Sequence, residues 1–306
     1  MIAYLVRRLG WGVLVLLGVS VITFVIAFAV PADPARNIAG IHATRAALAN
    51  IRHAYGLDQP LPVQYWRYLV HLLEGNLGRS YSLSEGVLPA ILERLPYSGI
   101  LGLCGLLVEL AIGIPLGLAA GLRPGSSVDR GTLVTTLIIF SMPPFVLGNF
   151  LLLILAFHWP FFPLGGADQG SSIVLPAITL GAGGAIWYSR LLRVTLMDVL
   201  RSDYVRTARA KGLSRHKVIL RHALPNAVGP IITQIGLDMG YFLGGVVVVE
   251  SVFAWPGVGK LAYDAISNDD TNLIMGTVLV SAVFVVLANI LVDVAQAWID
   301  PRIRLD

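Results

Sequence analysis

Residues 204–226 read YVRTARAKGLSRHKVILRHALPN and lie between long apolar segments of the chain. This stretch contains six of the 22 Lys and Arg residues and no acidic residue. Gly212 stands near its middle and Leu224-Pro225 near its end. So much positive charge in an otherwise apolar chain indicates a loop that is held on one side of a membrane.

The composition of the whole chain supports a membrane location. Of its 306 residues, 56% are hydrophobic and 13% are charged, whereas about a quarter of the residues in a soluble domain are charged. The positions of the charges are more informative than the net charge of +4. The single cysteine, Cys104, lies in an apolar run and excludes an intrachain disulfide.

Six segments reach the length of about 20 apolar residues that crosses a bilayer. They are residues 9–30, 96–122, 132–157, 173–196, 227–253 and 273–298. Each is predicted to be a helix, because backbone groups in lipid must bond within the chain. The first run is too long for the core of a signal peptide, about 7–15 residues, and is predicted to be the first span.

The distribution of Lys and Arg predicts that both termini are cytoplasmic. This orientation places 15 of the 22 basic residues inside, nine of them from the end of the fourth span through the loop that follows it. The expected fold is therefore all-α and integral to the membrane, with six transmembrane helices. Residues 1–95 would hold the first helix and a structured extracytoplasmic loop. Residues 96–306 would hold a five-helix core with a cytoplasmic loop at about 198–226.

The long outer loop is predicted to contain short surface helices. Residues 43–55 and 63–73 show helical spacing and end at Gly56 and Gly75. Residues 87–91 are predicted to form a short amphipathic lead-in to the second span. The spacing fits either helices that lie on the membrane or a docking surface.

The basic stretch is predicted to form two short helices joined at Gly212. Ser202 and Asp203 can cap a first helix over 204–211, and Gly212 fits the left-handed position after a helix end. Ser214 can cap a second helix to about residue 222. Leu224-Pro225-Asn226 is predicted to break the chain, with Pro225 in the first turn of the fifth span.

Two functions are open for this elbow on its residues alone. It could be an anchor that binds anionic lipid head groups; its tethering at both ends argues against a nucleic-acid partner. The small residues Ala208 and Ala210 and the rigid turn at Gly212 favour insertion into a cleft of another protein.

The spacing of the stretch resembles the cytoplasmic loop of ATP-binding-cassette importer permeases, in which Glu-Ala-Ala, three residues, Gly and nine residues lead to Ile-x-Leu-Pro. Gly212 takes the glycine position, and nine residues separate it from His222, which stands at the Ile position before Ala223 and Leu224-Pro225. The Glu-Ala-Ala positions hold Arg206-Thr207-Ala208 instead. With these departures, the loop resembles the form found in the dipeptide, oligopeptide and nickel permease subfamily.

Four further patches carry the same resemblance over nearly the whole chain: residues 4–9, 56–67 with 75–80, 250–259 and 300–304. The resemblance implies a type I importer permease fold in a bacterial inner membrane. It also implies a second homologous permease subunit, two ATP-binding cassette subunits or domains, and an extracytoplasmic substrate-binding protein. ATP and Mg²⁺ would bind those ATPases, because this chain has no Gly-Lys-Ser/Thr phosphate loop. We expect no cofactor and no enzymatic activity in this chain.

By resemblance, the elbow couples to the ATPase. The residues that would make this contact are Tyr204, Arg206, Ala208, Ala210, Lys211, Gly212, Leu213 and Pro225.

The fifth span is predicted to line a translocation pathway. Gln234, Asp238 and Tyr241 share one helical face with Gly245, and an acid within a membrane segment is a functional candidate. A row of small residues on the other side predicts close helix packing, at Gly236, Gly240 and Gly244. Asp238 could instead be a buried acid paired with a neighbouring helix.

Other polar residues of the spans also have predicted roles. A structural pair is expected for Glu109, and pairing with a neighbouring helix is expected for Asn289 and Asp293. Residues 141–144, Ser-Met-Pro-Pro, should kink the third span near the pathway, with Asn149 just beyond. The turn after the fifth span would, by resemblance, form the outer mouth, with Glu250, Phe253 and Trp255.

Two other classes of protein, a secondary transporter or channel and an intramembrane aspartyl protease, fit the sequence less well than an importer subunit. A secondary transporter or channel is disfavoured by the small number of spans and the lack of an inverted repeat. An intramembrane aspartyl protease would use Asp238 and Asp293, but the residues before Asp238 are Ile-Gly-Leu and do not fit the Gly-x-Gly-Asp signature. Within the resembling family, short peptides are the expected ligand, with nickel chelates or glutathione as alternatives.

Overall fold

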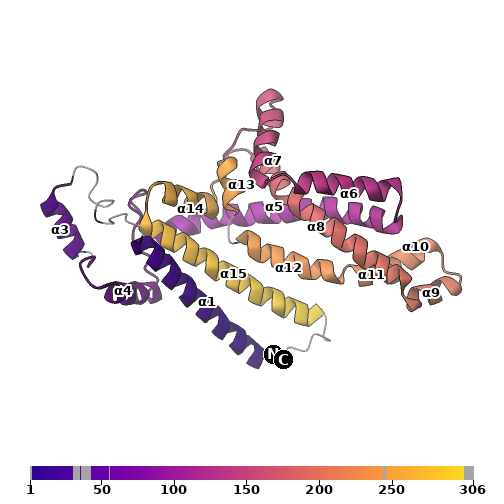
Figure 1. The fold of residues 1–306 in the computed structure, drawn as a ribbon, viewed down its shortest axis with the longest axis horizontal. Helices are drawn as coiled ribbons and strands as arrows, with labels where there is room; N and C mark the ends of the chain where they lie inside the picture. The colour runs from indigo at the N-terminus through magenta and orange to yellow at the C-terminus, as the bar shows by residue number, and fades with distance from the viewer. Residues whose placement is uncertain (1, 30–34, 36–42, 55, 244–245, 300–306) are drawn as a thin grey trace.

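The computed structural model describes residues 2–29, 35, 43–54, 56–243 and 246–299. Four long helices dominate this part of the chain: α1 (Ile2–Ala29), α5 (Val87–Leu122), α8 (Val174–Arg201) and α15 (Thr271–Ile299) (Figure 1). No strand longer than an isolated bridge occurs in the described ranges. The predicted all-α class is confirmed.

The remaining helices are short and connect or extend the long ones. Their bounds are α3 Arg45–Ala54, α4 Leu61–Leu73, α6 Ser127–Phe140, α7 Pro144–Leu151, η1 Leu152–His158, η2 Gly170–Ile173, α9 Asp203–Ala210, α10 Arg215–Lys217, η3 Val218–Ala223, α11 Leu224–Ala227, α12 Gly229–Leu243, α13 Val247–Val252 and α14 Val258–Ser267.

Four of the described helices are long and apolar enough to cross a membrane, and a bent pair raises the number to five. The pair joins α6 to α7 and η1 through a bend of 95°, at the Ser-Met-Pro-Pro sequence where a kink was predicted. Proline lacks the N–H that would continue the helix. Residues 227–253 do not form the single helix that was predicted, because α12 ends at Leu243 and Val246 has a non-helical backbone. Six spans and the sides of the termini remain predictions.

The lead-in predicted before residue 96 is not a separate helix. Helix α5 runs unbroken through Pro96 from Val87, so it crosses the proposed boundary at residues 95 and 96. Val87 and Ile91 are buried against Leu261 of α14 and Leu273 of α15. This packing stabilises the first turns of α5 and offsets the cost of an internal proline.

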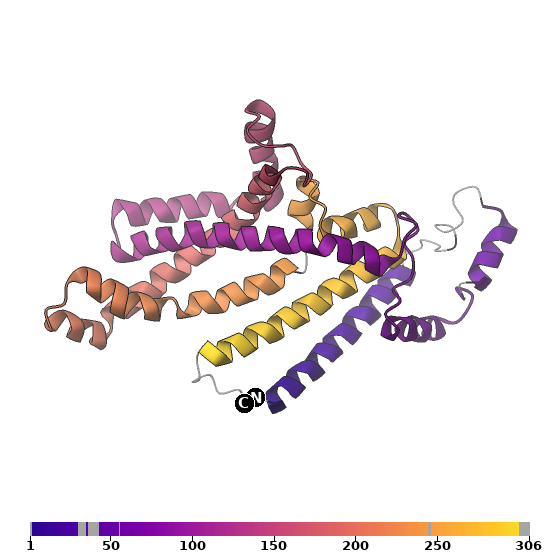
Figure 2. The same cartoon turned by 180° about the vertical axis from the view of Figure 1, so that it is seen from behind.

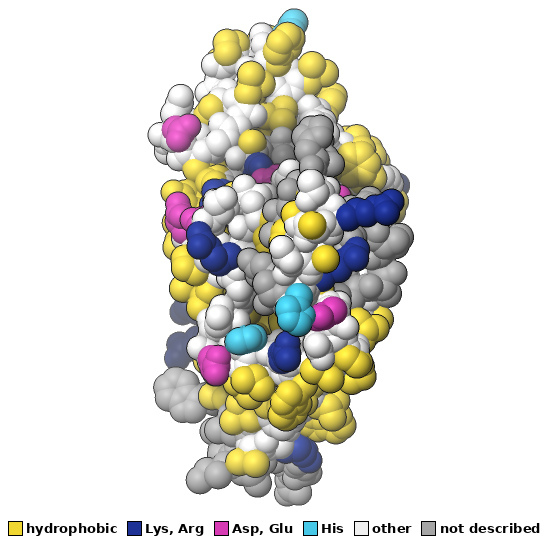
Figure 3. Space-filling view, turned by 90° about the vertical axis from the view of Figure 1, so that its left-hand side faces the viewer, with side chains coloured by type: hydrophobic (Ala, Val, Ile, Leu, Met, Phe, Trp, Pro, Cys, Tyr) yellow, Lys and Arg dark blue, Asp and Glu magenta, His cyan; other side chains and the backbone are white. Residues whose placement is uncertain are grey.

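The segment between α1 and α5 contains α3 and α4 at the predicted positions. Gly56 and Gly75 follow them with left-handed φ angles of 66° and 75°. This end of the molecule shows acidic, basic and histidine side chains among apolar ones (Figure 3). Nδ1 of His53 lies 3.0 Å from a carboxylate oxygen of Asp58, and Nδ1 of His71 lies 3.4 Å from one of Glu74.

Helices α5 and α8 lie side by side in both views (Figures 1 and 2). They pack closely at glycine positions. A Cβ atom at Gly113 would lie 2.6 Å from the carbonyl oxygen of Ala185, and one at Gly117 would lie 2.6 Å from that of Ser189. Gly181 of α8 similarly faces the backbone of α5 at Gly105. The absence of side chains at these positions lets the two backbones approach closely.

Helix α15 packs between α1 and α12. Arg8 of α1 forms an ion pair with Asp293 of α15 at 2.8 Å, so the pairing expected for Asp293 is present with Arg8, whereas Asn289 donates to the carbonyl of Val285. Gly236 of α12 faces Val292, and Gly240, a turn further on, faces Ala288. Gly244 lies outside the described residues.

A bidentate ion pair fastens the start of α6 to α8. Arg193 donates to both carboxylate oxygens of Asp129, at 2.6 and 2.8 Å. Asp129 is 2% exposed and also accepts from the backbone N–H of Gly125 at 2.8 Å. Paired donors in this geometry make strong charge-assisted bonds.

Replacing Arg193 by alanine is expected to lower the apparent melting temperature of the detergent-solubilised protein by roughly 5–10 °C, because it leaves the buried Asp129 carboxylate without its charged partner. Arg190→Ala is the matched control, since Arg190 lies on the same helix and is exposed. Equal melting temperatures for the two variants, measured by thermal unfolding, would contradict a structural role for the pair.

Candidate functional site

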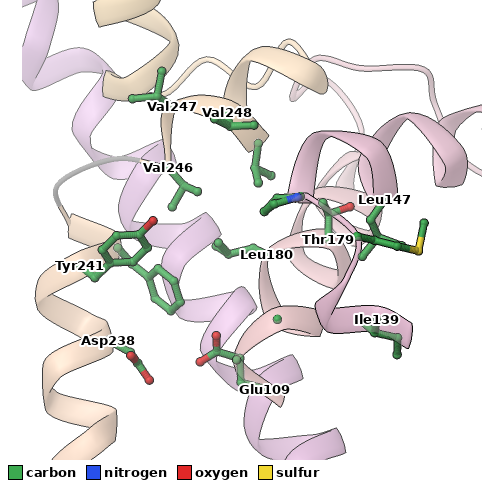
Figure 4. Close-up of a pocket in the computed structure, with 16 residues that line it drawn as sticks. Glu109, Ile139, Leu147, Thr179, Leu180, Asp238, Tyr241, Val246, Val247 and Val248 are labelled. Atoms are coloured by element: carbon green, nitrogen blue, oxygen red, sulfur yellow. The ribbon is translucent and has the colours of Figure 1, made fainter. Parts of the chain in front are cut away.

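A cavity of about 530 Å³ lies where α5, α8, α12 and α13 meet the α6–α7 bend (Figure 4). Its wall is mostly apolar, with two carboxylates on one side. The lining residues are Glu109, Ile139, Met142, Pro144, Leu147, Thr179, Leu180, Gly183, Gly184, Asp238, Tyr241, Phe242, Val246, Val247, Val248 and Val249. Its volume lies within the range of about 300–1,000 Å³ that small-molecule sites occupy.

Asp238 reaches this cavity from α12 and is held on both of its oxygens. The hydroxyl of Tyr188, on α8, donates to Oδ2 at 2.5 Å, and Nε2 of Gln234 donates to Oδ1 at 2.9 Å. Tyr188 is fully buried. The structure therefore brings Asp238 and Tyr241 to the cavity, whereas Gln234 lies behind Asp238 and orients its carboxylate.

Glu109 is the second carboxylate of the cavity and comes from α5. Its side chain is 3% exposed, and Oε2 has no hydrogen-bond partner in the described part of the chain. Oε2 therefore lacks the structural partner that is expected for this residue. Gly184 on α8 leaves the space that the carboxyl group occupies, since a Cβ there would overlap it. Figure 4 shows the carboxyl groups of Glu109 and Asp238 pointing toward one another.

Asn149 does not reach the cavity. Its side chain is exposed and donates to the carbonyl of Phe145 in its own helix at 2.8 Å. The 95° bend turns α7 so that Met142, Pro144 and Leu147 contribute to the wall instead. The position of the bend was predictable from its prolines, but its direction was not.

The turn after α13 is part of the interior in this conformation. Glu250, Phe253 and Trp255 are each at most 5% exposed. Glu250 accepts from Oγ of Ser98 at 2.6 Å and from the backbone N–H of Lys260 at 2.8 Å. These bonds fasten the turn to α5 and α14. The assignment of the three residues to the outer mouth stays a prediction.

The basic stretch forms the elbow that its sequence predicts. Helix α9 ends at Ala210, and Gly212 follows with φ of 77°, the left-handed conformation that favours glycine. Ser202 occupies the N-cap position, but its hydroxyl donates back to the carbonyl of Val199 at 2.6 Å. Ser214 likewise stands at an N-cap without a side-chain capping bond.

The chain break predicted at Leu224-Pro225-Asn226 is wrong. Residues 218–223 form a π-helical turn, η3, which runs directly into α11. The wider π turn accommodates Pro225, which lacks the N–H for a regular helix bond. The helix breaks instead at Val228, ahead of Gly229-Pro230.

The elbow has a buried face and an exposed basic face. Val205, Ala208 and Val218 pack against one another and against Val199 and Leu200 of α8. Ala208 thus stabilises the elbow internally. The other predicted coupling residues are exposed: Tyr204, Arg206, Ala210, Lys211, Gly212, Leu213 and Pro225.

Comparison with known families assigns the chain. The profile described as "Binding-protein-dependent transport system inner membrane component" matches residues 113–305, and the profile of its N-terminal region matches residues 1–102. The chain belongs to this family of binding-protein-dependent permeases. It is accordingly a multi-pass protein of a bacterial inner membrane.

Relatives of this permease match over the full length. It is 39% identical over 304 residues to the glutathione transport system permease protein GsiC of Salmonella paratyphi A, covering 99% of both chains. It is 36% identical over 316 residues to the oligopeptide transport system permease protein AppB of Bacillus subtilis, covering 99% of this chain and 100% of that one.

Solved structures support the fold of the permease core. A structure of the MetNI methionine ABC transporter in an inward-facing conformation aligns with a TM-score of 0.58 at 17% identity, over 69% of this chain and 96% of that one. An amino acid ABC transporter with histidines aligns with a TM-score of 0.53 over 70% of this chain and 94% of that one. The likeness confirms the predicted type I importer permease fold.

Proposed function

We propose that this permease forms half of the translocation pathway of an ATP-driven importer for short peptides. The observation that carries the proposal is the full-length identity of 36–39% to peptide and glutathione permeases. The cavity adds support, because its apolar wall can accept varied side chains while two carboxylates supply a constant polar group.

Contacts between the elbow and the helices around the cavity provide a route by which a movement of the elbow can change the shape of the cavity. Val205 of the elbow packs on the end of α8 at Val199 and Leu200. The same helix carries Tyr188, which is bonded to Asp238 of α12, and α12 is linked to the elbow through η3 and α11. A force on the elbow therefore reaches α8, which carries Tyr188, and α12, which carries the cavity residue Asp238.

The proposed partners are based on the family of the chain and on the exposed basic face of its elbow. We propose that the exposed basic face of the elbow, around Arg206 and Lys211, docks on a cytoplasmic ATPase that binds ATP and Mg²⁺. A second, similar permease subunit would complete the pathway. An extracytoplasmic binding protein would deliver the ligand and account for most of the selectivity.

Glutathione is a second candidate ligand, because the relative that is 39% identical carries that name. A nickel chelate has less support: the described residues contain no group of three His, Cys, Asp or Glu that could hold a metal ion, although a chelate brings its own ligands.

The proposal is tested by purifying the complex from its native host through a tag on this chain and reconstituting it in liposomes. Uptake of labelled tripeptides and of glutathione is then measured with the binding protein outside and ATP inside. We expect uptake that requires ATP and the binding protein. Uptake driven by a proton gradient without the ATPase would contradict an importer of this class.

A further inference from the structure

We propose that Glu109 and Asp238 form a site for a primary ammonium group, and that it receives the amino terminus of the passing peptide. The inference rests on the proposed function and adds to it a ligand group and the residues that bind it. The two carboxylates come from different helices, α5 and α12, and line the same cavity.

The first observation is the unsatisfied carboxylate of Glu109. Its side chain is 97% buried, as the 3% exposure shows, and Oε2 lacks a hydrogen-bond partner within the described residues. A buried polar atom without a partner is costly and needs an explanation. The carboxyl group lines the cavity and points toward that of Asp238 (Figure 4), so a ligand that enters between the two groups can supply the missing donor.

The second observation is the preorganisation of Asp238. Its two oxygens already accept bonds from Tyr188 and Gln234, which hold the carboxylate in place. Each oxygen of a carboxylate can accept two bonds, so one acceptor position per oxygen stays available. An ammonium group with three donors can therefore bond to both carboxylates at once.

The third observation is the charge of the wall. Among its lining residues the cavity has two acids and no Lys, Arg or His. Two carboxylates that face one low-dielectric space repel each other, and a cation between them removes that cost. The cavity is thus selective for positive charge.

An α-ammonium group fits the site better than a metal ion does. Divalent Ca²⁺ takes six to eight oxygen ligands and Mg²⁺ takes six, whereas the wall offers the carboxylates of two residues. Most of the remaining wall is apolar, including Val246–Val249 and Phe242, and makes no specific demand on a side chain. The one cationic group that every peptide with a free amino terminus shares is its ammonium.

The experiment uses the full reconstituted complex and trialanine as the probe, with N-acetyl-trialanine as its counterpart. Carbodiimide couples a carboxylate to an amine that lies in contact with it, and mass spectrometry locates the product. We expect trialanine to be coupled at Glu109 or Asp238 and N-acetyl-trialanine not to be. Glu93, an exposed carboxylate on α5 outside the cavity, reports non-specific coupling.

Uptake is measured in parallel for Glu109→Gln, which keeps the shape of a protonated glutamate but cannot carry charge. We expect its ATP-driven uptake of trialanine to fall by about tenfold or more, with Glu93→Gln, an exposed position on the same helix, as the control at wild-type rate. Equal melting temperatures show that the variant is folded.

The outcomes separate two failures. If the wild-type complex does not take up trialanine, the proposed function is overturned and this inference with it. If it does, and trialanine gives no product at either carboxylate or Glu109→Gln retains uptake within about twofold, the inference alone is overturned.

Discussion

Replacing Gly212 by valine is expected to reduce ATP-driven uptake by more than about tenfold while the permease remains folded in the membrane. Gly212 has φ of 77°, and a left-handed backbone costs an L residue about 1–2 kcal/mol, more if it is β-branched. No atom lies within 4 Å of the position of its Cβ. The strain is therefore conformational, and the exposed elbow can relieve it by turning, which misplaces its basic face.

Gly75→Val provides the matched control. Gly75 also has a left-handed backbone, with φ of 75°, and open space around its Cβ position, but it follows α4 at the opposite end of the molecule (Figure 1). Uptake in proteoliposomes and ATPase activity are measured for both variants. If the two lose uptake equally, the effect of Gly212→Val is loss of stability and not loss of coupling.

Replacing Gly113 by leucine is expected to prevent recovery of folded permease. A Cβ at this position would lie 2.6 Å from the backbone oxygen of Ala185 and 2.7 Å from Cβ of Tyr188. Neither neighbour is the end of a flexible side chain, so α5 and α8 must separate. Overpacking of this kind costs about 1–3 kcal/mol or more, and separation also disturbs the Tyr188–Asp238 bond.

A graded series measures this effect. Gly113→Ala should be less stable than wild type and Gly113→Leu should be lost, judged by the monodisperse fraction after solubilisation. Gly99→Leu is the control on the same helix, because no atom lies within 4 Å of its Cβ position. Comparable yields of Gly113→Leu and Gly99→Leu would contradict close packing of α5 on α8.

Local features of this fold could be predicted from the sequence because each depends on adjacent residues. The left-handed turn at Gly212 follows from glycine after a helical run, and α9 begins and ends one residue before its predicted bounds. The bend between α6 and α7 follows from two consecutive prolines. The four long helices follow from apolar length.

Contacts between helices could not be predicted, because they depend on how each helix is rotated about its axis. Asp238 was identified as a pathway candidate, but its partner Tyr188 lies 50 residues away on α8. Glu109 was expected to be paired, and its place in the cavity became clear only once α5, α8 and α12 were assembled. Arg8, counted as a topology signal, proved to be the partner of Asp293.

The close packing of α5 on α8 could have been predicted from the spacing of glycines in the sequence. Gly113, Gly117 and Gly121 recur every four residues on α5, the spacing of small residues at packed membrane helices. The fifth span carries the same spacing at Gly236, Gly240 and Gly244. By contrast, the continuity of α5 through Pro96 and the division of residues 227–253 depend on tertiary packing, which outweighs local propensity.

In the proposed mechanism, ATP hydrolysis acts through the elbow on the cavity. Cys104 is the only cysteine, so Cys104→Ser allows a single reporter cysteine to be placed at Val248, a half-exposed residue of the cavity wall. Its labelling rate by a membrane-impermeant thiol reagent is measured in the reconstituted complex with and without ATP. We expect ATP to change this rate severalfold, and Gly212→Val to abolish the change while ATP is still hydrolysed. An ATP-dependent change of the same size in Gly212→Val, or none in the parent complex, would contradict the claim.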